Sequence, residues 1–344
     1  MKSAAKRNLF LFGVPGKVGG AATKISALLR LLREDYRITV VLPKVQWMKD
    51  RYIRRLAGEL GFACILRKSL PARTEGDALA ICELDFFTSG TAERVKRAGL
   101  RLFWSNEMMW AFKGEREAVR KGWIDKVLFA SEFQAREFAE LYAGVPQAVT
   151  GNYISPDEFR FKERRNAAFT IGRLSRPDPV KFPADFPVFY EELGIGDARF
   201  RVMAWDAQLR KIYSWHRFDA RWDLLAMEKE GTEKFLHSLD LFVYPLGHRF
   251  LESWGRSTVE AMLTGAIPVV PRGHQFHKLL VSGESGFLCG AFSEYFDCVR
   301  ELHANYPLRR RMAERCRRHA VEALCRAESH REVWLSALDF EGGA

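Results

Sequence analysis

Short apolar runs rich in β-branched and aromatic residues alternate with helical patterns along the whole chain. In the first half, such runs predict strands at residues 8–12, 36–42, 62–66, 78–82, 100–104 and 126–130. Helical periodicity fills the intervals, most clearly over 21–33, 46–60 and 132–142, and Ser131 is well placed to cap the last of these helices. Strands that alternate with helices in this way predict a parallel α/β domain.

The composition of the sequence changes between residues 145 and 165, which are rich in proline, glycine and charged residues. We interpret this segment as a linker. A second alternating series follows, with strands expected at 167–171, 200–204, 239–244, 267–270 and 286–289, and with helices from residue 291 onward. The sequence therefore predicts one domain over 1–155, a second over 166–322, and a C-terminal helix over 323–344 that could cross back to the first. Two such domains would place a ligand in the cleft between them, at the carboxyl ends of strands.

Composition is that of a globular protein, but the charge is unbalanced. Lys and Arg number 54 against 43 Asp and Glu, which gives a formal net charge of +11 over 344 residues. Such an excess concentrates anions, namely phosphorylated ligands, acidic membrane surfaces or nucleic acid, without choosing among them. The densest basic runs are Arg309–Arg311 with Arg315, Arg317 and Arg318, and Arg51 with Arg54 and Arg55. Both read as solvated helix faces, with docking to an anionic membrane as the alternative. Because aromatic residues are not interleaved with them, nucleic acid is a poor partner.

The six cysteines form no C-x-x-C pair, and no histidine lies at zinc-finger spacing from them. Most fall on apolar stretches, which is typical of reduced thiols in a cytoplasmic protein. No run approaches the roughly 18 apolar residues of a membrane-spanning helix. The apolar start stops at Gly13, too soon for the h-region of a signal peptide, so we expect a strand there and a cytoplasmic location.

The first predicted strand runs into a loop that contains Gly13, Gly16, Gly19 and Gly20. Glycines at a strand-to-helix turn allow the backbone to approach a phosphate group, with the helix N-terminus behind it. The loop fits neither the Walker pattern, because Val18 follows Lys17, nor the pattern G-x-G-x-x-G. A tight turn that binds nothing is the alternative interpretation.

A second strand-to-loop turn carries cations. Arg173 follows Gly172 in a predicted strand end, and Arg176 and Lys181 come soon after it. An arginine fork and a lysine point charge can together hold a pyrophosphate. Ordinary solvated charges are the alternative for these side chains.

Two glutamates bracket a glycine-containing loop near residue 255. Glu252 precedes a predicted helix and Glu260 lies inside it, and eight residues of helix span roughly 12 Å. Paired carboxyl groups of glycosidases lie roughly 5 to 9.5 Å apart, so these two are poor acid and base partners. They suit hydroxyl clamps on either side of a diphosphate, which the N–H groups at the helix start would bind. His248, His274 and His277 lie in loops around this element, where polar surface histidines are the alternative to ligand contacts.

Taken in order, several segments resemble GT-B glycosyltransferases, specifically the large retaining group numbered as family four. The resemblance covers most of the chain. Its motifs are the Gly19–Gly20 loop, a strand-plus-serine element at 127–132, an asparagine turn at 151–154, a donor-phosphate strand at 172–175, the E-x7-E span from Glu252 to Glu260, and its continuation at 265–270 and 283–288. Each motif alone is loose, and their common order makes the resemblance specific.

The resemblance implies the GT-B architecture, in which two Rossmann-like α/β domains face a cleft. It implies a nucleotide-diphosphate sugar bound by the C-terminal domain, an acceptor against the N-terminal domain, and retaining transfer without a cofactor or metal ion. Arg173, Lys181 and Glu252 would be catalytic, the two cations at the leaving diphosphate and Glu252 at the donor sugar, while Glu260 would bind the ribose. The remaining donor-binding residues would be Gly19, Gly20, Arg176, Ser253, Trp254, Gly255, Arg256, Ser257 and Thr258. On the acceptor side the candidates are Asn106, Glu107 and His248.

The sequence also departs from the family pattern. The lysine of the family usually follows its arginine within a few residues, whereas Lys181 comes eight residues after Arg173. Arg176 could therefore replace Lys181 as the second phosphate cation. The acceptor-side histidine that many members carry has no counterpart here.

The sequence thus predicts a cytoplasmic retaining glycosyltransferase, with peripheral contact to the inner face of the membrane as an option. Its acceptor would be a glycan, a lipid-linked sugar or a small molecule. The alternative from another class is a catalytically inactive protein with the GT-B fold that binds an anionic membrane surface or nucleic acid. A Rossmann oxidoreductase is disfavoured because G-x-G-x-x-G is missing.

Overall fold

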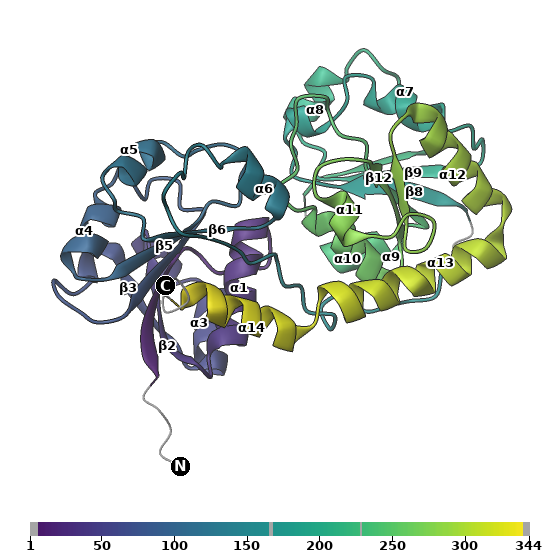
Figure 1. Ribbon diagram of the computed structural model, residues 1–344. Helices are drawn as coiled ribbons and strands as arrows, with labels where there is room; N and C mark the ends of the chain where they lie inside the picture. Colours follow the sequence, from purple (N-terminus) through teal and green to yellow (C-terminus); the bar gives the residue numbers. More distant parts are fainter. Residues whose placement is uncertain (1–5, 165–167, 228, 340–344) are drawn as a thin grey trace. The chain divides into compact units, whose positions relative to one another are not determined.

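The computed structural model describes residues 6–164, 168–227 and 229–339. These residues form two units, one from Met1–Tyr153 with Ala327–Ala344 and the other from Ile154–Arg326 (Figure 1). We call them unit 1 and unit 2. Each is a parallel α/β unit, which confirms the predicted fold class. The expected end of the linker at residue 165 and the expected strand start at residue 167 lie outside the described residues.

Unit 1 is built on a seven-stranded parallel sheet with the order β3-β2-β1-β4-β5-β6-β7. Its strands are β1 (Arg7–Phe12), β2 (Tyr36–Leu42), β3 (Ala63–Leu66), β4 (Asp77–Ile81), β5 (Arg101–Ser105), β6 (Lys126–Phe129) and β7 (Gln147–Val149). Its helices are α1 (Gly20–Leu32), α2 (Val45–Met48), α3 (Arg51–Leu60), α4 (Thr91–Arg97), α5 (Glu115–Arg120), α6 (Glu132–Glu137) and α14 (Ala327–Leu338), with a 3₁₀ turn η1 (Arg67–Ser69).

Side-chain caps explain where two helices of unit 1 start. The Ser131 hydroxyl accepts a hydrogen bond from the N–H of Gln134, so the predicted cap of α6 is confirmed. The helix expected over 46–60 is instead two helices, because Asp50 caps α3 by accepting from the N–H of Ile53. The helix expected over 132–142 is shorter than predicted, since α6 ends at Glu137.

The core of unit 1 lies on both faces of its sheet. Alternate side chains of β1 point to opposite faces, so Leu9 and Leu11 join one apolar cluster while Phe10 and Phe12 join the other. The first cluster includes α1, α3 and the buried ring of Trp334 from α14. The C-terminal helix is therefore part of the core of unit 1.

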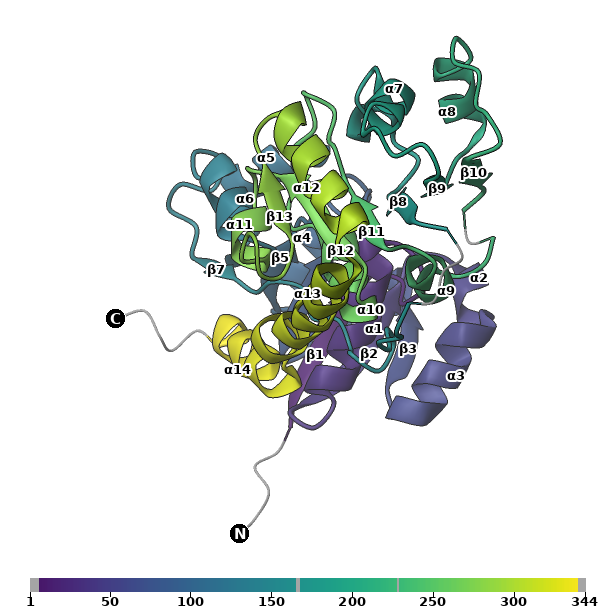
Figure 2. The ribbon, with the colours of Figure 1, turned by 90° about the vertical axis from the view of Figure 1, so that its right-hand side faces the viewer.

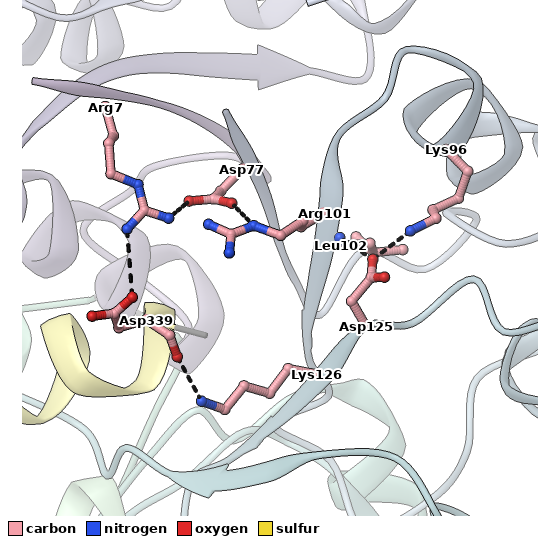
Figure 3. A network of polar contacts seen from close by, with 8 residues as sticks. All are labelled: Arg7, Asp77, Lys96, Arg101, Leu102, Asp125, Lys126 and Asp339. Atoms are coloured by element: carbon pink, nitrogen blue, oxygen red, sulfur yellow. Dashed lines mark hydrogen bonds and ion pairs between the residues drawn. The ribbon is translucent and has the colours of Figure 1, made fainter. Parts of the chain in front are cut away.

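A polar network closes the amino-terminal edge of the same sheet (Figure 3). The buried carboxylate of Asp77, which opens β4, accepts hydrogen bonds from Arg7 Nη2 at 2.8 Å and from Arg101 Nε at 2.7 Å. Asp339, directly after α14, joins through Arg7 at 3.8 Å, and its backbone oxygen accepts from Lys126 Nζ at 3.2 Å. The network holds the chain after α14 against the starts of four strands, opposite to the edge where ligands of such sheets bind.

Unit 2 is built on a six-stranded parallel sheet with the order β10-β9-β8-β11-β12-β13. Its strands are β8 (Thr170–Leu174), β9 (Arg199–Met203), β10 (Trp222–Leu225), β11 (Leu241–Val243), β12 (Ile267–Pro271) and β13 (Phe287–Cys289). Its helices are α7 (Phe186–Glu191), α8 (Ala207–Ile212), α9 (Thr232–His237), α10 (Arg256–Thr264), α11 (Phe276–Leu279), α12 (Phe292–Ala304) and α13 (Tyr306–His319), with a 3₁₀ turn η2 (Pro179–Lys181) and a π-helix (Ala320–Leu324).

Strand β8 runs further than the sequence predicted, because Gly172 lies inside it rather than after it. Gly172 pairs with Arg201 of β9, and a Cβ atom on Gly172 would lie 2.3 Å from the backbone oxygen of Arg201. Glycine is thus required there for close strand packing, and Arg173 becomes a strand residue.

The basic run on α13 is only partly a solvated face. Helix α13 packs along α10, as Figure 2 shows. Arg317 donates to the backbone oxygens of Leu263 at 2.9 Å and Pro156 at 3.2 Å, and Arg309 donates to that of Leu302 at 2.6 Å. These two arginines support the fold, while Arg310, Arg311, Arg315 and Arg318 are exposed.

Candidate functional site

The strand orders locate the candidate sites. In each sheet the direction of strand addition reverses at one place, between β1 and β4 in unit 1 and between β8 and β11 in unit 2. Ligands of open α/β sheets bind at this reversal, outside the carboxyl ends of the strands. The loops after β8 and β11 therefore frame a candidate site in unit 2, and those after β1 and β4 frame one in unit 1.

Three polar side chains meet at the reversal in unit 2. Lys181 Nζ lies 3.1 Å from Glu252 Oε2 and 3.3 Å from the hydroxyl of Tyr244, and that hydroxyl donates to Glu252 Oε2 at 3.1 Å. Lys181 is only 7% exposed. The structure thus brings together the predicted residues Lys181 and Glu252, with Tyr244 as a third member. Sequence reasoning missed Tyr244, although its place directly after β11 is a usable signal.

Burial and charge act on this cluster in opposite directions. Burial lowers the pKa of Lys181, but the Glu252 carboxylate and the hydroxyl of Tyr244 outweigh it, so the pKa of Lys181 is raised overall. For the hydroxyl of Tyr244, burial raises the pKa. At neutral pH the site therefore presents an ammonium and a neutral phenol beside Glu252.

Arg173 lies beneath this cluster rather than on its surface. Its side chain is fully buried, and its guanidinium carbon lies 3.9 Å from the ring centroid of Phe182 and 4.6 Å from that of Tyr244. Nη1 donates to the backbone oxygen of Pro245 at 2.9 Å, and Nη2 to that of Lys181 at 3.2 Å. Burial lowers the pKa of Arg173. Arg176, by contrast, is exposed, and its positive charge acts on Lys181.

The segment from Glu252 to Glu260 turns into α10 at Gly255. Gly255 has φ 94°, and a Cβ atom there would lie 2.9 Å from the ring of Phe276, so glycine is required. Helix α10 follows at once with Arg256, and the N–H groups of its first turn point out of the helix start. Ser253, Trp254, Ser257 and Thr258 belong to this turn and helix, with Trp254 and Thr258 buried.

Glu260 is buried on α10 and paired within the helix. Its Oε1 accepts from Arg256 Nε at 2.8 Å. Burial raises the pKa of Glu260, and the charge of Arg256 opposes that rise. The predicted donor residues Arg256 and Glu260 therefore form an ion pair with each other.

Backbone strain marks the same edges of both sheets. Four described residues other than glycine have left-handed backbone, and each follows a strand: Cys82 after β4, Glu107 after β5, Ala204 after β9 and His274 after β12. Such strain gathers at functional sites. His274 also accepts the N–H of Glu252 on Nδ1 at 3.4 Å, so it helps to place Glu252. His248 and His277 are exposed.

In unit 1, Gly19 and Gly20 stand exposed at the start of α1. Gly19 has φ 85°, and Cβ atoms at either glycine would meet nothing within 4 Å. The loop is tied to α1, because the N–H of Gly16 donates to the hydroxyl of Ser26 at 3.0 Å. An open, glycine-lined helix start therefore lies at the reversal between β1 and β4.

The two acceptor-side candidates after β5 have different surroundings. Asn106 is fully buried, donates to Glu115 and to the backbone oxygen of Trp110, and accepts from the N–H of Met108. Its amide shapes the loop. Glu107 forms a buried ion pair with Lys24 of α1 and accepts from the hydroxyl of Ser105 at 2.6 Å.

Exposed apolar side chains gather at the carboxyl edge of the sheet in unit 1. Val18 follows β1, Val45 follows β2, Leu84 follows β4 and Trp110 follows β5, and they are 43%, 53%, 76% and 47% exposed. These four strands are neighbours in the order β2-β1-β4-β5. The exposed lysines Lys17, Lys44 and Lys113 lie in the same loops. We call these seven residues the apolar-basic edge.

No protein-family model matches the chain, and no characterised protein matches it significantly by sequence. Its three-dimensional structure, however, is similar to several solved ones. The Anabaena protein Alr3699/HepE in complex with UDP-glucose matches with a TM-score of 0.74 at 15% identity, over 96% of this chain and 99% of that one. TarM matches with a TM-score of 0.77 at 11% identity, over 99% and 100%. A glycosyltransferase from Rickettsia africae matches with a TM-score of 0.74 at 10% identity, over 97% and 98%.

The chain has the GT-B fold. Similarity over the full length of both chains establishes this, and at these identities it establishes the fold alone. Membership of family four stays a resemblance carried by the motifs. Among the described helices of the GT-B chain, none has the length and apolar character needed to cross a membrane.

Proposed function

We propose that the chain is a glycosyltransferase that moves a sugar from a nucleotide-diphosphate donor to an acceptor. The observation that carries the proposal is the cluster of Lys181, Tyr244 and Glu252 at the strand reversal of unit 2, beside the glycine turn that opens α10. A cation, a carboxylate and the N–H groups of a helix start are what a diphosphate sugar requires. A neighbour with the same fold, Alr3699/HepE, was solved with UDP-glucose, which supports the donor class.

The proposed chemistry needs no protein nucleophile. The bond between the sugar carbon and the diphosphate oxygen breaks while the acceptor oxygen bonds to the same face of that carbon, so that configuration is retained. The proton of the acceptor hydroxyl passes to the departing phosphate oxygen. Lys181 and the N–H groups at the start of α10 stabilise the negative charge that develops on the diphosphate. Glu252 accepts hydrogen bonds from sugar hydroxyls, and Glu260 from those of the ribose.

We propose further that this transfer proceeds without a metal ion, because Lys181 and its neighbouring cation would neutralise the diphosphate in place of Mg²⁺. Full activity in the presence of EDTA supports this, and activity that returns only with added Mg²⁺ or Mn²⁺ contradicts it.

The apolar-basic edge favours one acceptor class among those that the sequence leaves open. Trp110 and Leu84 suit apolar chains at an interface, while Lys17, Lys44 and Lys113 suit anionic head groups. We therefore propose a lipid-linked or otherwise amphiphilic acceptor, and peripheral contact of unit 1 with an anionic membrane on its cytoplasmic side.

A thermal-shift panel of nucleotide sugars tests the donor class. Bound donor stabilises the protein by RT ln(1 + [L]/Kd), so a ligand at 100 times Kd adds about 2.7 kcal/mol. We expect one base and sugar to raise Tm in the wild type, and Glu260→Ala to reduce that rise. Unchanged affinity of Glu260→Ala for every nucleotide sugar contradicts the assignment. Vesicle binding that falls with salt, with no turnover of any nucleotide sugar, instead supports an inactive membrane-binding protein.

A further inference from the structure

The side chain of Arg173 is buried, and both of its Nη atoms are hydrogen-bonded within the protein. Its side chain is fully buried, and its Nη atoms donate to Pro245 O, Lys181 O and, at 3.4 Å, the hydroxyl of Ser175. The rings of Phe182, Tyr244 and Phe186 pack against the guanidinium, with centroids 3.9, 4.6 and 5.3 Å from its carbon. Among the polar atoms of this side chain, only Nε has no hydrogen-bond partner in the described part of the chain, and it too is buried.

The partners of Arg173 show what it holds. Lys181 O belongs to η2, and Pro245 O belongs to the loop after β11 that leads from Tyr244 to Glu252. Arg173 itself lies in β8. One guanidinium in β8 therefore ties together the two segments that carry the Lys181, Tyr244 and Glu252 cluster. Because a guanidinium is a planar fork with donors in fixed directions, it sets these segments at fixed distances.

Arg176 has the exposure that Arg173 lacks. It comes two residues after the end of β8, at the carboxyl edge of the sheet, and its side chain is exposed. Its charge also reaches Lys181, where it opposes the effect of Glu252 on the pKa of that lysine. Two cations, one exposed and one 7% exposed, thus lie at the strand reversal above the buried Arg173.

We infer that Arg173 is a positioning residue, and that Arg176 and Lys181 are the two cations that bind the donor diphosphate. The inference rests on the proposed function and differs from the role that the family resemblance implies for Arg173. It assigns to Arg173 an effect on phosphate binding that passes through Lys181, and to Arg176 a direct contact.

Isothermal titration with nucleoside mono- and diphosphates tests the inference. The ratio of the Kd of UMP to that of UDP measures what the second phosphate adds, and the pairs GMP/GDP and AMP/ADP serve if the protein prefers another base. We expect Arg176→Gln to lower this ratio about tenfold, the order of one charge-assisted hydrogen bond. Arg311→Gln, an exposed arginine of α13, is the matched control and should leave the ratio unchanged.

A double-mutant cycle separates the positioning role from direct contact. Lys181→Met keeps the chain length and removes the charge. We expect Arg173→Lys to lower the ratio in the wild type and to have no further effect on it in Lys181→Met, because Arg173 acts through Lys181. Arg176→Gln should lower the ratio in both backgrounds.

The outcomes distinguish this inference from the proposed function. If the wild type binds none of UDP, GDP and ADP, both are overturned. If it binds one of them, an unchanged ratio in Arg176→Gln overturns the inference alone. An equal decrease in the Kd ratio when Arg173→Lys is introduced into the wild type and into Lys181→Met also overturns the inference alone. Should Arg173→Lys fail to fold, the Arg176→Gln and Lys181→Met variants still decide the assignment of the two cations.

Discussion

Lys181 Nζ and Glu252 Oε2 form a buried ion pair 3.1 Å long, and the hydroxyl of Tyr244 bonds to both. The pair joins residues 71 positions apart, so it depends on the parallel sheet that brings the ends of β8 and β11 together. In the proposed function one partner meets phosphate and the other meets sugar. The ion pair would keep both side chains placed before the donor arrives.

Glu252→Gln should lower kcat by roughly 10² to 10³-fold, the loss seen when one transition-state hydrogen bond is removed. The amide is similar in size but cannot accept as strongly from sugar hydroxyls. Steady-state kinetics with the donor identified by thermal shift measures the effect. Glu284→Gln, an exposed glutamate of unit 2, is the control and should be as active as the wild type. Wild-type kcat in Glu252→Gln would remove Glu252 from the site.

Glu260 should make the stability of the protein fall as pH rises through the acidic range. Its pKa is raised in the folded state because burial disfavours the carboxylate, so the folded protein binds this proton more tightly than the unfolded chain does. The stability contribution is full below the unfolded pKa and is lost as pH rises through the folded pKa. Glu260→Gln cannot titrate, so its Tm minus that of the wild type should increase between pH 4 and pH 7. A difference independent of pH contradicts the burial argument.

Asp77→Asn should destabilise unit 1 without weakening donor binding. The carboxylate of Asp77 is buried between Arg7 and Arg101, and hydrogen bonds to charged groups contribute about 1.5–3 kcal/mol. Thermal unfolding should show a lower Tm, while titration with the nucleoside diphosphate should give the wild-type Kd, because the network lies at the amino-terminal edge of the sheet in unit 1 and the proposed diphosphate cations lie in unit 2. A changed Kd would show that the network does more than hold the sheet edge.

Trp334→Ala should cost about 3–5 kcal/mol of unfolding free energy, as for other buried tryptophans. The ring is buried in the cluster with α1 and lies 5.2 Å from Lys24 Nζ. Chemical denaturation followed by circular dichroism measures the loss. Val333→Ala, next to it but exposed, should change stability far less. Equal losses in the two variants would contradict the role of α14 as a core helix.

The apolar-basic edge should bind vesicles that contain anionic lipid. Replacing Leu84 and Trp110 by serine should reduce binding several-fold, and replacing Lys17, Lys44 and Lys113 by glutamine should remove its dependence on anionic lipid and on salt. Vesicle co-sedimentation with and without anionic lipid measures both effects. The matched control replaces Arg310 and Arg311 on α13 with glutamine. If only the control loses binding, the basic helix is the contact instead.

The alternation of apolar runs was sufficient to predict both sheets, because strands such as β4, in which all five residues are buried, contain continuous apolar segments that the sequence shows directly. It failed for β7 and β10, which are short and lie at sheet edges. β10 carries Asp223 among its few residues, and β7 falls within the segment read as a linker. The other two edge strands, β3 and β13, consist of apolar residues and were predicted, so composition rather than edge position decides whether the sequence reveals a strand.

The candidate site was predictable as a set of residues but not as an arrangement. Lys181 and Glu252 were expected to touch the donor separately, and nothing in their spacing shows that they pair. The burial of Arg173 was equally hidden, because it arises from rings of Phe182 and Tyr244 that reach it only in the folded sheet. The motifs identify which residues belong to the candidate site, whereas the packing of the folded chain decides which of them can face a ligand.

The return of the chain into unit 1 through α14 sets an order of events during synthesis. Trp334 completes a core whose other members, such as Leu9 and Ile25, leave the ribosome some 300 residues earlier. Unit 2, which is one continuous segment, is fully translated before that ring emerges. Unit 1 is therefore synthesised first but completes its fold last. During translation the surface of α1 against which α14 packs stays exposed.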